Sequence, residues 1–278
     1  MTASGEAIAQ AFIAACRAEL DAPKPGNVHV LAAGKRKTVA DFLASAEAAA
    51  APLTQADARV GKRILGAVEA SVAAVPRNTN LGIILLCAPL AAAAERVPPD
   101  LRAALAAELE RLDVEDAELA FKAIAFAAPG GLGTAPRHDV RAPATVSLRQ
   151  AMAAAAERDR IARQYVTGFA DVFDLGEPLL AASLARWKQA KWATLAVYLG
   201  FLSTFADSHV AREHGLAVAE EVRRRAATFE PRLRQAVEPD VLVPDLLAWD
   251  AALKDRGVNP GTSADLTVAT LFVHRLRA

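Results

Sequence analysis

Apolar residues recur at intervals of three and four along almost the whole chain, which is the period of a helix with one buried face. The first run contains Ile8, Phe12, Ala15 and Leu20, and it ends before Pro23 because a residue that precedes proline disfavours the helical conformation. No alternating strand pattern occurs, so the sequence predicts an all-α fold. Further helices are expected at 40–59, 61–75, 81–96, 100–111, 114–127, 146–173, 177–206, 209–228, 241–255 and 263–276.

One long connection, residues 129–143, is rich in glycine and proline. Neither a Walker loop nor a dinucleotide-binding motif fits it, because no strand precedes it and no Gly-Lys-Ser/Thr occurs. A mobile lid that carries Arg141 and a plain surface loop are both consistent with its sequence. No internal repeat and no linker divide the chain. We therefore expect residues 1–278 to form a single-domain multi-helix bundle with its active site at helix ends.

The amino-acid composition limits the classes of partner that this chain is expected to bind. Hydrophobic residues make up 53% of the chain and aromatic residues only 5%, a balance typical of packed helices. The 32 basic and 32 acidic residues cancel, so the chain has no overall attraction for nucleic acid or anionic lipid, and a phosphate must be held locally. The longest apolar stretch, 192–205, is too short to span a bilayer, and the N-terminus lacks the features of a signal peptide. We expect a cytoplasmic protein in which Cys16 and Cys87 are buried apolar side chains.

Polar residues gather where helices begin and end, first at Pro23-Lys24-Pro25-Gly26-Asn27-Val28-His29. Two prolines stiffen the backbone around Lys24, and Gly26 permits a sharp turn. Such a lysine could meet a phosphate at little entropic cost; an ordinary helix end with an exposed lysine is the alternative. A second patch precedes the apolar run that begins at Ile83, where a helix start offers N–H groups to an anion. One residue suffices as the cap there, which leaves two for a ligand or for solvent among Asn78, Thr79 and Asn80.

One acidic residue interrupts a predicted apolar helix face. In the helix expected at 146–173, Asp159 is the only charge in a row with steps of four and three: Leu148, Met152, Ala155, Asp159, Ala162, Val166, Phe169 and Phe173. A carboxylate on an apolar face is costly unless it is paired or bound to a cation. A role in a site and an internal salt bridge with Arg163, four residues further on, both explain it.

Two more patches lie in the second half of the chain. Asp207-Ser208-His209-Val210-Ala211-Arg212 follows a row of small residues that would leave space for a ligand, although a capped surface helix also fits. Asn259-Pro260-Gly261-Thr262-Ser263-Ala264-Asp265 opens the last helix, where a cap alone is again an alternative. Because Asp265 would repel a bare phosphate, a phosphate role there requires Mg²⁺. Acidic, basic and amide groups at helix ends, without a thiol nucleophile or zinc spacing, favour a magnesium-nucleotide site.

Four of these segments, in this order, resemble the motifs of triphosphoribosyl-dephospho-CoA synthases: Pro23–His29, Asn78–Gly82, Asp207–Arg212 and Asn259–Leu266. The resemblance implies an all-helical enzyme that uses ATP to build 2′-(5″-triphosphoribosyl)-3′-dephospho-CoA and releases adenine. The acceptor's ribose hydroxyl would attack the anomeric carbon of ATP in a glycosyl transfer. A carboxylate would activate the hydroxyl or stabilise an oxocarbenium-like carbon.

The residue patterns and the resemblance together suggest a role for each candidate residue. Asp159 and Asp207 are the expected catalytic residues, and Asp207 and Asp265 are expected to lie close together as ligands of Mg²⁺. The remaining candidates are expected to bind the nucleotide: Lys24, Gly26, Asn27, Asn78, Thr79, Asn80, Arg141, His209, Arg212, Gly261, Thr262 and Ser263. The implied partners are ATP and dephospho-CoA or a related coenzyme; whether the protein forms a homo-oligomer is open.

The chain departs from the family pattern at the second motif. Members that serve citrate lyase usually have a histidine and a lysine where this chain has Asn80 and Leu81, and their Arg-Gly-Glu-Ala segment is not recognisable here. The segments 137–141 and 158–165 instead resemble a shorter branch of the family. A transferase that builds another coenzyme, such as a one-carbon carrier, and a non-catalytic nucleotide-binding helical protein therefore stay as alternatives.

Overall fold

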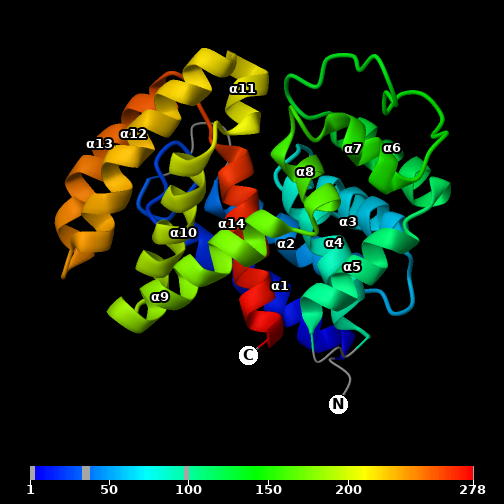
Figure 1. Cartoon of the computed structure of the whole chain (residues 1–278), viewed down its shortest axis with the longest axis horizontal. Coiled ribbons are helices and arrows are strands. Elements are labelled where there is room, and N and C mark those ends of the chain that lie inside the picture. Colours follow the sequence, from blue (N-terminus) through cyan, green and yellow to red (C-terminus); the bar gives the residue numbers. More distant parts are fainter. Residues whose placement is uncertain (1–3, 33–37, 97–99, 278) are drawn as a thin grey trace. The chain divides into compact units, whose positions relative to one another are not determined.

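The structure, a computed structural model, describes residues 4–32, 38–96 and 100–277. These residues form fourteen α-helices, one π-helical turn and one 3₁₀ turn (Figure 1). The described part contains no β-strand, only an isolated bridge between His29 and Ala32. The predicted all-α fold is thus confirmed. No helix in the described ranges is long and apolar enough to cross a membrane.

The described chain divides into two compact units. Unit 1 comprises the described residues within 1–14, 41–170 and 275–278, and unit 2 those within 15–40 and 171–274. Helices α1 and α14 each contribute residues to both units. The expectation of a single domain stays a prediction.

Unit 1 is built around α4, a helix that is buried on every side except at one residue. Its apolar sequence from Leu81 to Ala94 explains this, since no polar face is left to meet water. A close approach joins α3 to α6: a Cβ atom at Gly61 would lie 2.7 Å from Asp116 Cα. The unit contains the first part of α1 (Gly5–Leu20), most of α2 (Val39–Leu53), α3 (Val60–Ala74), α4 (Leu81–Ala94), α5 (Leu101–Arg111), α6 (Val114–Ala127), α7 (Leu148–Ala155) and α8 (Arg160–Thr167).

The prediction of a single helix over residues 146–173 is wrong. The chain there forms α7, a turn, α8 and the π-helical turn η1 (Asp171–Gly176). Asp159 is the N-cap of α8, and its Oδ1 accepts hydrogen bonds from the backbone N–H groups of Ile161 and Ala162. It therefore does not lie within an apolar helix face. Aspartate is a favoured N-cap, so capping accounts for its position at a break in the helical pattern.

Unit 2 contains a core formed by α10, α12 and α13. The rings of Phe229 and Trp249 are stacked with centroids 5.1 Å apart, so that α12 and α13 lie side by side (Figure 1). Two further predicted helices are each interrupted, 177–206 at Lys188 and 209–228 at Gly215, both residues with positive φ. The unit contains α9 (Glu177–Trp187), α10 (Ala190–Thr204), α11 (Ser208–His214), α12 (Leu216–Gln235), the 3₁₀ turn η2 (Pro239–Leu242), α13 (Val243–Asp255) and most of α14 (Gly261–Arg277).

Candidate functional site

Three of the predicted motif segments meet in unit 2. We call residues 23–29, 207–212 and 259–265 the three-segment cluster. Asn27 Nδ2 donates to Asn259 Oδ1 at 2.9 Å, which joins the first segment to the last. The hydroxyls of Ser208 and Thr262 lie 2.9 Å apart, and the His209 N–H donates to Thr262 Oγ1 at 3.1 Å. Segments that are far apart in sequence are thus held together by direct polar contacts.

Asp207 joins two helix starts of this cluster. Its side chain is fully buried. Oδ1 caps α11 by accepting from His209 N–H at 3.0 Å and Val210 N–H at 3.1 Å. Oδ2 accepts from the backbone N–H and the hydroxyl of Ser263, both at 2.8 Å, in the first turn of α14. A carboxylate has about four lone-pair sites, so protein donors use the full accepting capacity of Asp207.

Two glycines permit close contacts within the cluster. A Cβ atom at Gly261 would lie 2.3 Å from His209 Nδ1, so only glycine allows the imidazole to rest against the start of α14. Gly26 has a φ of 83°, and a Cβ atom there would lie 2.8 Å from Pro260 Cδ. The half-buried His209 ring is also held from its own helix, because Nε2 lies 3.2 Å from Glu213 Oε1. His209 and the half-buried Arg212 are the cluster's predicted binding residues that reach solvent.

Lys24 is buried completely, with its ammonium held by the protein itself. Nζ lies 2.5 Å from Glu19 Oε1 and donates to Val28 O at 2.7 Å and to Asn27 Oδ1 at 3.1 Å. Burial lowers the pKa of Lys24 and raises the pKa of Glu19, and the contact between the two groups opposes both shifts. The alternative of an exposed lysine at a helix end is therefore wrong. In this conformation Lys24 fixes the loop from within, and its expected contact with phosphate stays a prediction.

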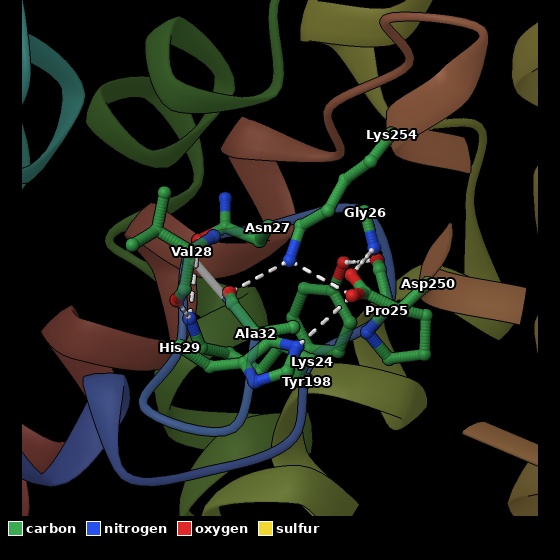
Figure 2. A network of polar contacts seen from close by, with 10 residues as sticks. All are labelled: Lys24, Pro25, Gly26, Asn27, Val28, His29, Ala32, Tyr198, Asp250 and Lys254. Carbon is green, nitrogen blue, oxygen red and sulfur yellow. Dashed lines mark hydrogen bonds and ion pairs between the residues drawn. The ribbon is translucent and has the colours of Figure 1, made fainter. Parts of the chain in front are cut away.

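Other side chains hold the same loop from outside (Figure 2). Tyr198 Oη donates to Pro25 O at 2.7 Å, and Asp250 Oδ1 accepts from Gly26 N–H at 2.8 Å. Burial raises the pKa of Tyr198 well above its ordinary value, which keeps this donor protonated. Glu19, Tyr198 and Asp250 were not predicted as site residues, because each lies within a regular helical pattern outside the motifs.

The second motif segment belongs to unit 1, where its polar side chains form hydrogen bonds with other residues of the protein. Asn78 Oδ1 accepts from the N–H of Leu81, the first residue of α4, at 3.2 Å. Thr79 Oγ1 donates to Ser45 Oγ at 2.6 Å, and Asn80 Nδ2 donates to Ser71 Oγ at 3.1 Å. Thr79 and Asn80 are buried. All three residues thus have structural partners, and their nucleotide contacts stay predictions.

Arg141 and Asp159 also lie in unit 1. Arg141 is exposed, and its guanidinium donates to Gly133 O within the 129–143 connection. Asp159 is half-buried and caps α8, so the costly-charge argument for a catalytic role no longer applies. The roles proposed for both residues stay predictions.

The two carboxylates expected to bind Mg²⁺, Asp207 and Asp265, both belong to the three-segment cluster. Asp207 contacts Ser263, two residues before Asp265 in α14. Asp265 is half-buried and near Cys16, whose pKa it helps to raise, after burial and Glu19. In the part of the chain that the structure describes, no group of three or more His, Cys, Asp or Glu side chains could hold a metal ion. The residues therefore do not form a complete metal site by themselves.

Comparisons with known proteins found a matching family model and a solved structure of similar fold. The family model CitG, described as ATP:dephospho-CoA triphosphoribosyl transferase, matches residues 5–278. A crystal structure from Archaeoglobus fulgidus, provisionally assigned as a triphosphoribosyl-dephospho-CoA synthase, superposes with a TM-score of 0.63 at 23% identity. The superposition covers 85% of this chain and 99% of the other and shows a common fold. No curated protein sequence matches the chain.

The family match spans nearly the whole sequence, including all three segments of the cluster and the second motif, which belongs to unit 1. The resemblance seen in the motifs is thereby confirmed. The chain belongs to the CitG family of ATP:dephospho-CoA triphosphoribosyl transferases and is a transferase that moves the triphosphoribosyl group of ATP.

Proposed function

We propose that the three-segment cluster binds the nucleotide and that 3′-dephospho-CoA is the acceptor. The observation that carries this proposal is the direct bonding of the three segments through Asn27–Asn259, Ser208–Thr262 and Asp207–Ser263. These contacts hold the helix starts and the glycine turn in fixed positions relative to one another, as a preorganised ligand site requires.

The reaction breaks the bond between the anomeric carbon of ATP and adenine and forms a bond from that carbon to a ribose hydroxyl oxygen. The hydroxyl loses its proton, and adenine leaves with one. His209 and Arg212 are half-buried groups of the cluster that can reach the nucleotide, with the imidazole fixed by Gly261 and Glu213. Asp207 would position them by holding the start of α11, rather than accept the proton itself.

We further propose that Mg²⁺ neutralises the triphosphate when the substrate is bound. Magnesium is usually held by one or two carboxylates together with substrate phosphates, so an incomplete protein site is consistent with it. Asp265 is the carboxylate of the expected pair that this geometry favours, because the oxygens of Asp207 already accept four hydrogen bonds. A cytoplasmic location and a homo-oligomeric state stay predictions.

The acceptor is tested by incubating the enzyme with Mg-ATP and a panel of acceptors, with adenine and the coupled product measured by mass spectrometry. We expect one adenine for each molecule of triphosphoribosyl-dephospho-CoA. Adenine release with another acceptor alone would support the alternative coenzyme, to which the departures at Asn80 and Leu81 point. Binding of ATP without release of adenine in the presence of any acceptor would contradict the proposal.

A further inference from the structure

Asp250 in α13 lies outside every recognised motif, yet it contacts the first segment of the cluster at two points (Figure 2). Its side chain is buried, with only 2% of the residue exposed. Oδ1 accepts from Gly26 N–H at 2.8 Å. Oδ2 lies 3.4 Å from His29 Nε2, in a contact that does not meet hydrogen-bond geometry. One carboxylate thus touches both the glycine turn and the last residue of the segment.

Lys254, one turn further along α13, extends this contact. Its Nζ donates to Asp250 Oδ2 at 2.8 Å and to Ala32 O at 3.0 Å. The ammonium therefore neutralises the buried carboxylate and also holds the backbone just beyond His29. Together the two side chains fix the chain from Gly26 to Ala32, the stretch that follows the buried Lys24.

The pKa shifts of Asp250 and His29 are consistent with Asp250 as an ionised hydrogen-bond acceptor for the loop. Burial raises the pKa of Asp250, but contacts with His29, Lys254 and the Gly26 amide outweigh it and lower the pKa overall. Burial lowers the pKa of His29, so the imidazole is neutral at pH 7. Asp250 is then an ionised acceptor whose counter-charge is Lys254.

We propose that Asp250 is a positioning residue of the enzyme, which holds the Gly26 turn in the conformation that binds the nucleotide. This rests on the proposed function of the three-segment cluster. A purely structural role would require only that the charges of Asp250 and Lys254 cancel. A positioning role requires, in addition, the hydrogen bond to Gly26, and this difference can be measured.

The test compares two double variants in which both charges are removed. D250N/K254M keeps an oxygen that can accept from Gly26, whereas D250L/K254M does not. We expect both to fold, with KM for ATP or for dephospho-CoA at least roughly tenfold higher in D250L/K254M than in D250N/K254M and a smaller change in kcat. D245N, which alters an exposed aspartate of the same helix that pairs with Arg232, should match the wild type.

Equal KM values in the two folded double variants would overturn the positioning role. If D250L/K254M does not fold, D250A/K254M, which also lacks the acceptor for Gly26, takes its place: a KM at least roughly threefold above that of D250N/K254M supports the inference, and an equal KM overturns it. If the wild type releases no adenine with dephospho-CoA, the proposed acceptor fails, and ATP affinities of the same variants measured by calorimetry replace KM. The two failures are therefore distinguishable.

Discussion

Replacing Asp207 with alanine should lower the free energy of unfolding by about 4 kcal/mol, because four donors lose their buried acceptor at once. Those donors are the N–H groups of His209, Val210 and Ser263 and the hydroxyl of Ser263. Chemical denaturation followed by circular dichroism measures the loss. Activity should fall with it, since the starts of α11 and α14 would no longer be joined.

Asp100 supplies a matched control for capping alone. Its exposed side chain caps α5 by accepting from the N–H groups of Arg102 and Ala103, with no second helix attached. D100A should therefore cost only about 1 kcal/mol. An equal loss in D207A and D100A would show that the bonds from Asp207 to Ser263 contribute nothing to stability.

Replacing Lys24 with methionine should destabilise the protein by about 3–5 kcal/mol, because Glu19 would be left buried without its partner. The contact removed is the 2.5 Å pair between Nζ and Glu19 Oε1. The double variant K24M/E19M, which replaces the pair by apolar side chains, should recover most of this loss. Thermal and chemical denaturation of the single and double variants give the comparison.

In the double variant K24M/E19M, the affinity for Mg-ATP should stay low even though stability is regained. K24M/E19M still lacks the ammonium that holds Val28 O and Asn27 Oδ1, so the loop is less well fixed. We expect its affinity for Mg-ATP to be at least roughly tenfold lower than that of the wild type, measured by calorimetry. Wild-type affinity in a variant that has regained stability would exclude Lys24 from both the support of the site and contact with phosphate.

Helical periodicity predicted the fold class but not every break in the helices. Leu148, Met152, Ala162 and Phe169 are buried as the row of apolar residues implied, but Val166, in the same row, is exposed. The row nevertheless crosses a turn, because the apolar spacing on either side of Asp159 happens to continue the same period. A cap acts through one or two hydrogen bonds, which leave little trace in a pattern that extends over many residues.

In the candidate site, the sequence predicted features that depend on neighbouring residues but not contacts between residues far apart in the chain. The glycine turn, the helix starts and their capping residues are local features, and three of these segments do meet. The support of the turn is not local: Gly26 and Asp250 are 224 residues apart in sequence. In the sequence, Asp250 and Lys254 form an ordinary pair with a spacing of four, typical of a solvated helix face, so nothing marks their burial.

A structure of the enzyme with ATP and dephospho-CoA bound tests the central claim most directly. The account predicts that the triphosphate contacts residues from at least two of the segments 23–29, 207–212 and 259–265, with His209 or Arg212 among them. A triphosphate bound without contact to any of the three segments would contradict it.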